Sequence, residues 1–121
     1  MSSSSWVSWV IVCDSEPSDF DSIASLAAEM SAYFLEHEPD TTHFEWSSTA
    51  ERSHVHIHER YANSEQALAH MAAFGQQFGS RFMALLKPVS VVVYGNPSAE
   101  LRSALEGLSP AFTQPFAGFH R

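Results

Sequence analysis

The chain has 121 residues, of which 45% are hydrophobic and 17% are charged, a composition that supports one buried core and excludes an intrinsically disordered chain. Fourteen Asp and Glu residues outnumber six Lys and Arg residues, so the formal net charge is −8 with neutral histidines. This charge excludes nucleic acid or an anionic membrane as a partner bound through a broad basic surface.

The first third of the chain predicts a strand and a helix. Residues 1–5 are expected to form a disordered tail. Residues 6–13 (WVSWVIVC) predict a strand buried on both faces, and this apolar stretch is too short to span a bilayer. Its last residue, Cys13, is the single cysteine, which permits no disulfide within the chain and favours a cytoplasmic location. Ser18 is predicted to cap a helix that ends at residues 38–40 and has one apolar stripe, formed by Phe20, Ile23, Ala27, Met30 and Phe34.

The next segment predicts a β-hairpin. Residues 42–48 and 54–61 have the pattern of two strands, joined by the polar residues 49–53. Side chains alternate strictly along the second strand (HVHIHERY). One face carries His54, His56 and His58, and the other carries Val55, Ile57, Glu59 and Tyr61.

A second helix is expected after the hairpin. Asn63 and Gln66 have the spacing of a capping box and start a helix that continues to the Lys87-Pro88 pair. Gly75 and Gly79 are expected to bend or break this helix.

The last part of the chain completes the order of a known fold class. Residues 89–94 (VSVVVY) predict a strand and residues 98–106 a short helix, while residues 109–121 are expected to form an edge strand or a loop. The order β-α-β-β-α-β, followed by a C-terminal extension over residues 96–121, is that of a single α+β, ferredoxin-like domain. Its helices cover one face of the sheet, and apolar residues on both strand faces predict a homodimer in which a second copy covers the other face.

Three segments match one family pattern in their order and spacing. They are residues 38–46 (EPDTTHFEW), residues 55–61 (VHIHERY) and residues 64–70 (SEQALAH). The pattern resembles that of the antibiotic biosynthesis monooxygenase-like family, although Asp40 stands where the family usually carries glycine. The resemblance covers residues 7–94 and leaves the C-terminal extension outside it.

This resemblance implies a dimeric α+β barrel with a ligand cavity between the sheet and the helices of each protomer. The family includes cofactor-independent oxygenases that act on quinols or polyphenolic anthrones, so we expect a quinol-like or polyphenolic aromatic ligand and no cofactor. The haem-degrading members use an Asn on the first strand and a His late in the second helix. Residues 6–13 contain no Asn and residues 76–86 contain no His, so haem degradation is not predicted.

Glu59 and His70 are the predicted catalytic residues. Glu59 shares the apolar face of its strand, and His70 borders the apolar stripe of the second helix, so both are expected to reach one cavity. A base in an apolar, water-poor pocket can deprotonate a quinol or a hydroxyanthrone to an anion that reduces O₂ directly. The alternative is that Glu59 and His70 bond to each other and have only a structural role.

Aromatic side chains from several elements are predicted to line a pocket for a flat aromatic ligand, with ordinary core packing as the alternative. These predicted ligand-binding residues are Phe44, Trp46, Tyr61, Phe74, Phe78 and Tyr94.

The histidine triplet on the third strand allows three interpretations. Alternate residues on a strand lie about 6.7 Å apart and point the same way, so His54, His56 and His58 could bind a metal ion. The resemblance instead places this face against the dimer partner, where the imidazoles would be polar interface groups. A third interpretation is a pH-sensitive contact, because protonated histidines beside their symmetry mates repel one another. A non-catalytic dimer that binds a small molecule or a metal therefore remains the alternative to an enzyme.

Overall fold

The computed structural model describes residues 5–121, so most of the tail predicted for residues 1–5 lies outside the described part of the chain. Ser5 is described, and its hydroxyl donates a hydrogen bond to the carbonyl of Ala62 at 3.2 Å. The elements are β1 (Val7–Ser15), η1 (Pro17–Asp19), α1 (Phe20–His37), β2 (Thr41–Ser48), β3 (His54–Tyr61), α2 (Ser64–Gln77), α3 (Gly79–Leu85), β4 (Leu86–Gly95), α4 (Ala99–Leu105), η2 (Glu106–Leu108) and β5 (Ala111–Phe112). Within residues 5–121, no helix is long and apolar enough to cross a membrane.

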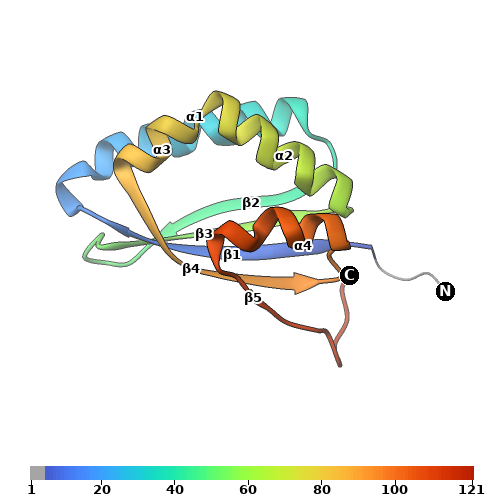
Figure 1. Ribbon diagram of the computed structural model, residues 1–121. Coiled ribbons are helices and arrows are strands. Elements are labelled where there is room, and N and C mark those ends of the chain that lie inside the picture. Colours follow the sequence, from blue (N-terminus) through green and yellow to red (C-terminus); the bar gives the residue numbers. More distant parts are fainter. Residues whose placement is uncertain (1–4) are drawn as a thin grey trace.

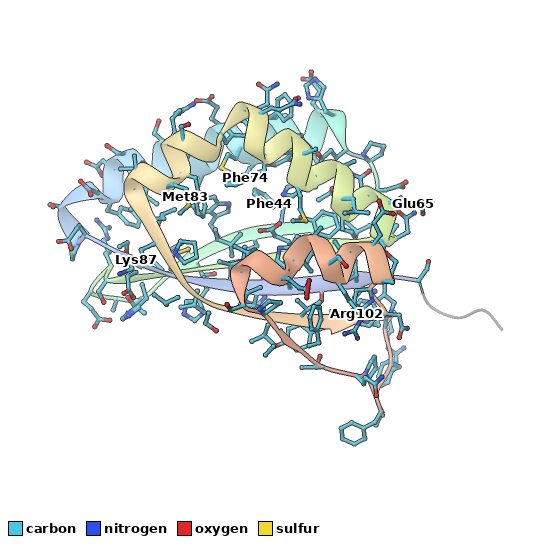
Figure 2. All side chains as sticks on the ribbon, in the orientation of Figure 1. Phe44, Glu65, Phe74, Met83, Lys87 and Arg102 are labelled. Carbon is cyan, nitrogen blue, oxygen red and sulfur yellow. The ribbon has the colours of Figure 1, made fainter. Side chains whose placement is uncertain are left out.

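The strands form one sheet in the order β2-β3-β1-β4-β5. The first four strands pair antiparallel, and β5 adds in parallel to the edge of β4. The helices lie over one face of this sheet, and side chains fill the space between the two layers (Figures 1 and 2). This arrangement confirms the ferredoxin-like α+β prediction. Of the tail predicted as an edge strand or a loop, residues 111–112 form an edge strand and residues 113–121 have no regular secondary structure.

The helix boundaries confirm some local predictions and correct others. Asn63 Oδ1 accepts a hydrogen bond from the backbone amide of Gln66 at 2.8 Å, so α2 begins where the capping pattern predicted. The predicted cap at Ser18 is wrong, because Pro17–Asp19 form a 3₁₀ turn and the N-cap of α1 is Asp19. Phe78, with φ −132°, separates α2 from α3, so the second helix is broken beside Gly79 and is uninterrupted at Gly75.

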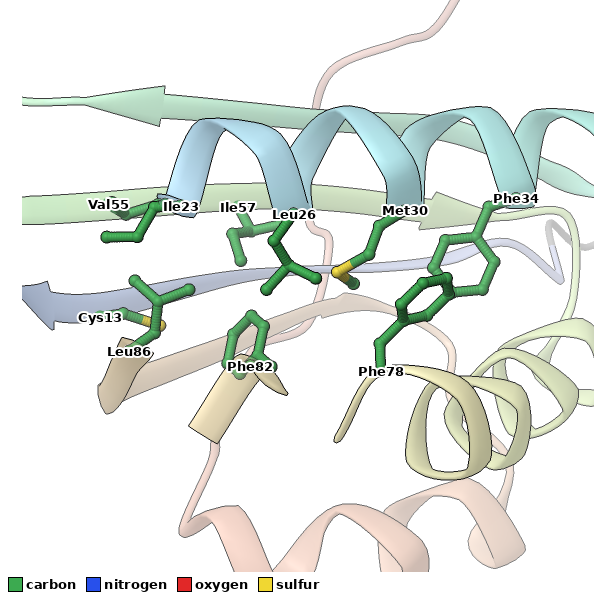
Figure 3. Close-up of a cluster of buried hydrophobic side chains, with 10 residues drawn as sticks. All are labelled: Cys13, Ile23, Leu26, Met30, Phe34, Val55, Ile57, Phe78, Phe82 and Leu86. Carbon is green, nitrogen blue, oxygen red and sulfur yellow. The ribbon is translucent and has the colours of Figure 1, made fainter. Parts of the chain in front are cut away.

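Two clusters of buried side chains fill the space between helices and sheet. The first joins α1 and α3 to β1, β3 and the start of β4 (Figure 3), and includes Cys13, Ile23, Leu26, Met30, Phe34, Val55, Ile57, Phe78, Phe82 and Leu86. The second joins α2 and α4 to β1, β3 and β4, and includes Val7, Trp9, Tyr61, Ala67, Val91, Val93, Leu101 and Leu105. The buried stripe of α1 includes Leu26 in place of the predicted Ala27, which is only half-buried.

No helix within residues 5–121 covers the other face of the sheet, which we call the open face (Figure 1). Ser8, Val10 and Val12 of β1 and Val92 of β4 are half-buried there, while His54 and His58 of β3 are exposed. A single chain therefore buries only one face of β1, and the prediction that both faces are buried requires something else to cover the open face.

The chain after β5 returns to the beginning of β1. The His120 ring lies edge-on to Trp6 with ring centroids 5.0 Å apart, and its Nε2 atom lies 3.1 Å from Nη1 of Arg60. Phe116 and Phe119 are exposed in the same tail. The C-terminal extension thus reaches a corner of the open face and presents apolar rings there.

Candidate active site

The candidate site is built by three elements that are far apart in sequence. The alternation of side chains along β3 directs Glu59 toward the helices. His70 lies near the middle of α2, and Glu38 directly follows the last residue of α1. All three side chains are buried, with 6%, 4% and 7% of the surface of Glu59, His70 and Glu38 exposed. Buried ionisable groups need partners, and these three supply one another.

The His70 imidazole lies between the two carboxylates. Its Nδ1 atom is 2.9 Å from Oε1 of Glu38, and its Nε2 atom is 3.2 Å from Oε1 of Glu59. Burial by itself works to lower the pKa of His70, but the hydrogen bond and charge of Glu59, followed by those of Glu38, outweigh it and raise that pKa above its usual value. The site therefore favours an imidazolium that donates from both nitrogens.

The outer carboxylate, Glu38, is itself fixed in place. The Thr41 hydroxyl donates to Oε1 of Glu38 at 2.8 Å, so this oxygen accepts from both Thr41 and His70. Glu38 does not line the cavity described below, so it is connected to that cavity through its contact with His70. A carboxylate on Nδ1 fixes the orientation of the ring and directs Nε2 toward Glu59.

The inner carboxylate, Glu59, has one oxygen bound and one free. The hydroxyl of the fully buried Tyr61 donates to Oε1 of Glu59, the same oxygen that His70 contacts. The contacts that Glu59 makes with the other described side chains all involve Oε1, and none involves Oε2. Burial, and then the charge of Glu59, raises the pKa of Tyr61 well above its usual value, so Tyr61 acts as a neutral hydrogen-bond donor.

Glu59 and His70 form the polar part of a cavity of about 400 Å³ between the sheet and the helices. Phe44 of β2, Phe74 of α2 and Met83 of α3, which are labelled in Figure 2, all line this cavity. The remaining lining is apolar and consists of Trp9, Ile11, Met30, Trp46, Ile57, Met71, Phe82, Pro88, Val91, Ala104, Leu105, Gly107 and Leu108. An apolar cavity with a few convergent polar groups is the usual form of a small-molecule site.

The predicted ligand-binding aromatics divide into three groups in the structure. Phe44, Trp46 and Phe74 line the cavity. Tyr61 lies behind Glu59 and positions its carboxylate. Phe78 and Tyr94 lie elsewhere: Phe78 packs against Phe34 in the first core cluster, and Tyr94 is exposed on the open face, because its position on β4 alternates with the inward-facing Val93.

The histidine triplet does not converge on one point. His54 Nε2 lies 3.3 Å from Oδ1 of Asp14, and the centroids of the His58 and His43 rings are 6.4 Å apart. Within residues 5–121, no group of three or more His, Cys, Asp or Glu side chains is placed to hold a metal ion.

Glu38 is the site residue that the sequence interpretation missed. It lies within the EPDT segment that carries the family resemblance, where its position before Pro39 predicts only the end of a helix. Its contact with His70 spans 32 residues along the chain, and no local pattern indicates such a pairing. The one signal in the sequence is Thr41, three residues later, because its hydroxyl can donate a hydrogen bond to the carboxylate of Glu38.

Comparison with known proteins places the fold. No family model and no curated protein sequence matches the chain. The solved structure of MupZ from Pseudomonas fluorescens has a TM-score of 0.86 at 18% identity, covering 96% of this chain and 94% of that one. A candidate antibiotic biosynthesis monooxygenase from Nitrosomonas europaea has a TM-score of 0.67 at 14% identity, covering 79% and 94% of the two chains. Another, from Chloroflexus aurantiacus, has a TM-score of 0.63 at 11% identity, covering 78% and 96%. The chain thus has the fold of the antibiotic biosynthesis monooxygenase-like proteins.

Proposed function

We propose that the protein is a small acid–base enzyme, a cofactor-independent monooxygenase, that acts on a quinol-like or polyphenolic substrate. The observation that carries this proposal is the Glu59 carboxylate at the polar part of an apolar cavity, with Oε1 held by two donors and Oε2 free to accept a proton. A general base must lie within hydrogen-bond reach of the proton it removes, and Glu59 is the carboxylate that lines the cavity.

The proposed chemistry begins with one proton transfer. A substrate hydroxyl that lies against Oε2 of Glu59 passes its proton to this carboxylate and becomes an anion. The His70 imidazolium, held by Glu38, then offers a nearby positive charge to that anion. The electron-rich anion passes one electron to O₂, the second substrate, and the two radicals combine in a C–O bond at a carbon that carries hydrogen. The resulting peroxide takes up the proton held by Glu59. Cleavage of its O–O bond with loss of the hydrogen on that carbon then releases one oxygen atom as water and leaves the other in the product as a carbonyl. The apolar walls exclude water, which strengthens these electrostatic interactions.

The comparisons support this proposal at the level of reaction class. Two of the similar structures carry names that designate them as candidate antibiotic biosynthesis monooxygenases. The aromatic walls contributed by Phe44, Trp46 and Phe74 suit a flat aromatic substrate, since aromatic rings pack well against each other in offset or edge-on arrangements.

The proposal is tested by measuring oxygen uptake with a panel of quinols and hydroxyanthrones. Glu59→Gln keeps the shape of the side chain and removes the base, so we expect turnover to fall by about 10²–10⁴-fold. Glu65→Gln is the matched control, because Glu65 is exposed in the first turn of α2, away from the cavity. Turnover that survives Glu59→Gln unchanged would remove Glu59 as the base.

One observation favours a second candidate function, a non-catalytic small-molecule-binding protein. Glu38, Glu59, Tyr61 and His70 are bonded to one another, and such a set can be a purely structural network. In that case ligands bind in the cavity, and the same panel yields no oxygen uptake with the wild-type protein.

A further inference from the structure

The cavity also carries information about the charge of its ligand. Its wall contains two ionisable side chains, Glu59 and His70, and no Lys or Arg among the described residues lines it. Neither Lys87 nor Arg102, which are labelled in Figure 2, lines the cavity. Lys87 is exposed on β4, and the Arg102 guanidinium lies 4.4 Å from the centre of the Phe112 ring.

The buried network leaves the polar part of the cavity with a negative charge. Glu38 and Glu59 carry two negative charges, and a protonated His70 compensates one of them. Tyr61 stays neutral because its pKa is raised by burial and by Glu59. A carboxylate or phosphate entering this cavity would lose its hydration and meet an uncompensated like charge, which is strongly unfavourable in an apolar surrounding.

The exposed part of the lining marks the entrance. Met83 of α3 is 60% exposed and Leu108 of η2 is 43% exposed, and Ala104 and Gly107 beside Leu108 are exposed as well. Glu59 and His70 are buried. A ligand therefore passes an apolar entrance between α3 and the α4–η2 segment before it reaches the ionisable groups, and the entrance provides no compensation for a charge.

We propose that this cavity selects uncharged ligands, with one polar group directed to Glu59, and excludes carboxylates and phosphates. The proposal rests on the proposed function in that it concerns the ligand of the same site. It adds a specificity rule: the negative charges of Glu59 and Glu38 disfavour anionic ligands, so the substrate binds as a neutral hydroxyl compound.

The test is isothermal titration calorimetry at neutral pH with two probes of matched shape, neutral 2-naphthol and anionic 2-naphthoate. We expect 2-naphthol to bind about tenfold more tightly or better. Glu59→Gln removes one of the two negative charges, so it should bring the two affinities to within about threefold. Equal binding of both probes to the wild-type protein, or no binding of either, overturns the proposal.

A second pair of variants locates the selection at the entrance. Leu108→Arg places a cation at the exposed rim, where we expect it to raise the affinity for 2-naphthoate by about threefold. Leu35→Arg is the matched control, because Leu35 is exposed on α1 outside the cavity lining. An equal change in both variants would contradict the assigned entrance.

These outcomes separate the specificity rule from the catalytic proposal. Selective binding of 2-naphthol without oxygen uptake from quinols overturns the oxygenase proposal and supports charge selection. Quinol turnover together with 2-naphthoate binding as tight as that of 2-naphthol supports the oxygenase proposal and overturns charge selection.

Discussion

At the residue scale, the unusual feature is one imidazole shared by two buried carboxylates. Breaking a buried charge pair is costly because it leaves the other charge without compensation. His70 therefore has a structural role beside any chemical one. Cys13 is buried as well. Burial, followed by the charges of Glu59 and Asp14, raises the pKa of its thiol to about 12. The thiol therefore stays protonated and is not a nucleophile.

His70 predicts a specific dependence of stability on pH. Its folded-state pKa is raised above 6.5, so its contribution is fully present below about pH 6.5 and is lost as the pH rises through the raised pKa. Glu38→Gln keeps a hydrogen-bond acceptor for His70 but removes one of the two charges that raise this pKa. We expect the variant to lose about 1.5–3 kcal/mol of unfolding free energy at the acidic end of this range and to lose less as the pH rises.

Urea unfolding between about pH 6 and pH 9 measures this effect. Glu36→Gln is the control, because Glu36 is exposed two residues away and contacts the surface side chain of His37. A stability difference between wild type and Glu38→Gln that does not change with pH would show that His70 does not carry a proton in the folded protein.

At the element scale, the glycine that ends β4 is required by the backbone, whereas the glycine inside α2 is not. Gly95 ends β4 with φ +91°, and a Cβ atom there would lie 2.5 Å from the carbonyl oxygen of Trp6. Gly75 lies inside α2, where a Cβ atom would meet nothing within 4 Å. The first position requires glycine for backbone conformation and space, and the second does not.

The two alanine variants should therefore change stability in opposite directions. Gly95→Ala is expected to lower the unfolding free energy by about 1–3 kcal/mol, since both the positive φ and the contact with Trp6 oppose it. Gly75→Ala is expected to raise it by about 0.5–1 kcal/mol, since alanine is the better helix former. Thermal unfolding of both variants measures this, and destabilisation of the same size in both would contradict the assignment of the α2 interior.

At the scale of the whole molecule, the open face is an apolar surface that the helices of one chain leave uncovered. Val10, Val12 and Val92 form an apolar strip along β1 and β4, and the exposed Phe116 and Phe119 lie in the tail that reaches the same face. Contiguous apolar surface of this kind usually marks an interface. We expect a second copy of the chain to cover it as a two-fold dimer, with the cavity of each protomer on the far side of its sheet.

Sedimentation velocity tests the dimer. Val10→Asp places a charge in the middle of the open face and should shift the protein from dimer to monomer, because a buried unpaired carboxylate opposes association. Ala72→Asp is the control, since Ala72 is exposed on α2, on the helical side. Wild-type protein that sediments as a folded monomer at low concentration would contradict this expectation.

The sequence by itself determined the order of the main strands and helices, although not all of their bounds. The strict alternation of residues 54–61 defined β3 with its observed bounds and directed Glu59 toward the helices, because side chains on a strand alternate regardless of what surrounds it. The Asn63 cap and the apolar spacing placed His70 on the inner side of α2 for the same local reason. The helix pattern failed at Ser18, where a 3₁₀ turn intervenes, since propensity is weak against the packing of a short segment. The break beside Gly79, by contrast, agrees with the prediction from the sequence.

Only the tertiary structure decided which polar groups meet. The approach of Glu38 to His70 depends on how α1 and α2 pack over the sheet, and the bonding of both Tyr61 and His70 to one oxygen of Glu59 depends on their distances. The cavity likewise required α4 and η2, which come from the extension outside the family pattern, to form one wall. Periodicity fixes the direction of a side chain from its own element, whereas a contact requires the relative placement of two elements, and that placement is set by packing of the whole core.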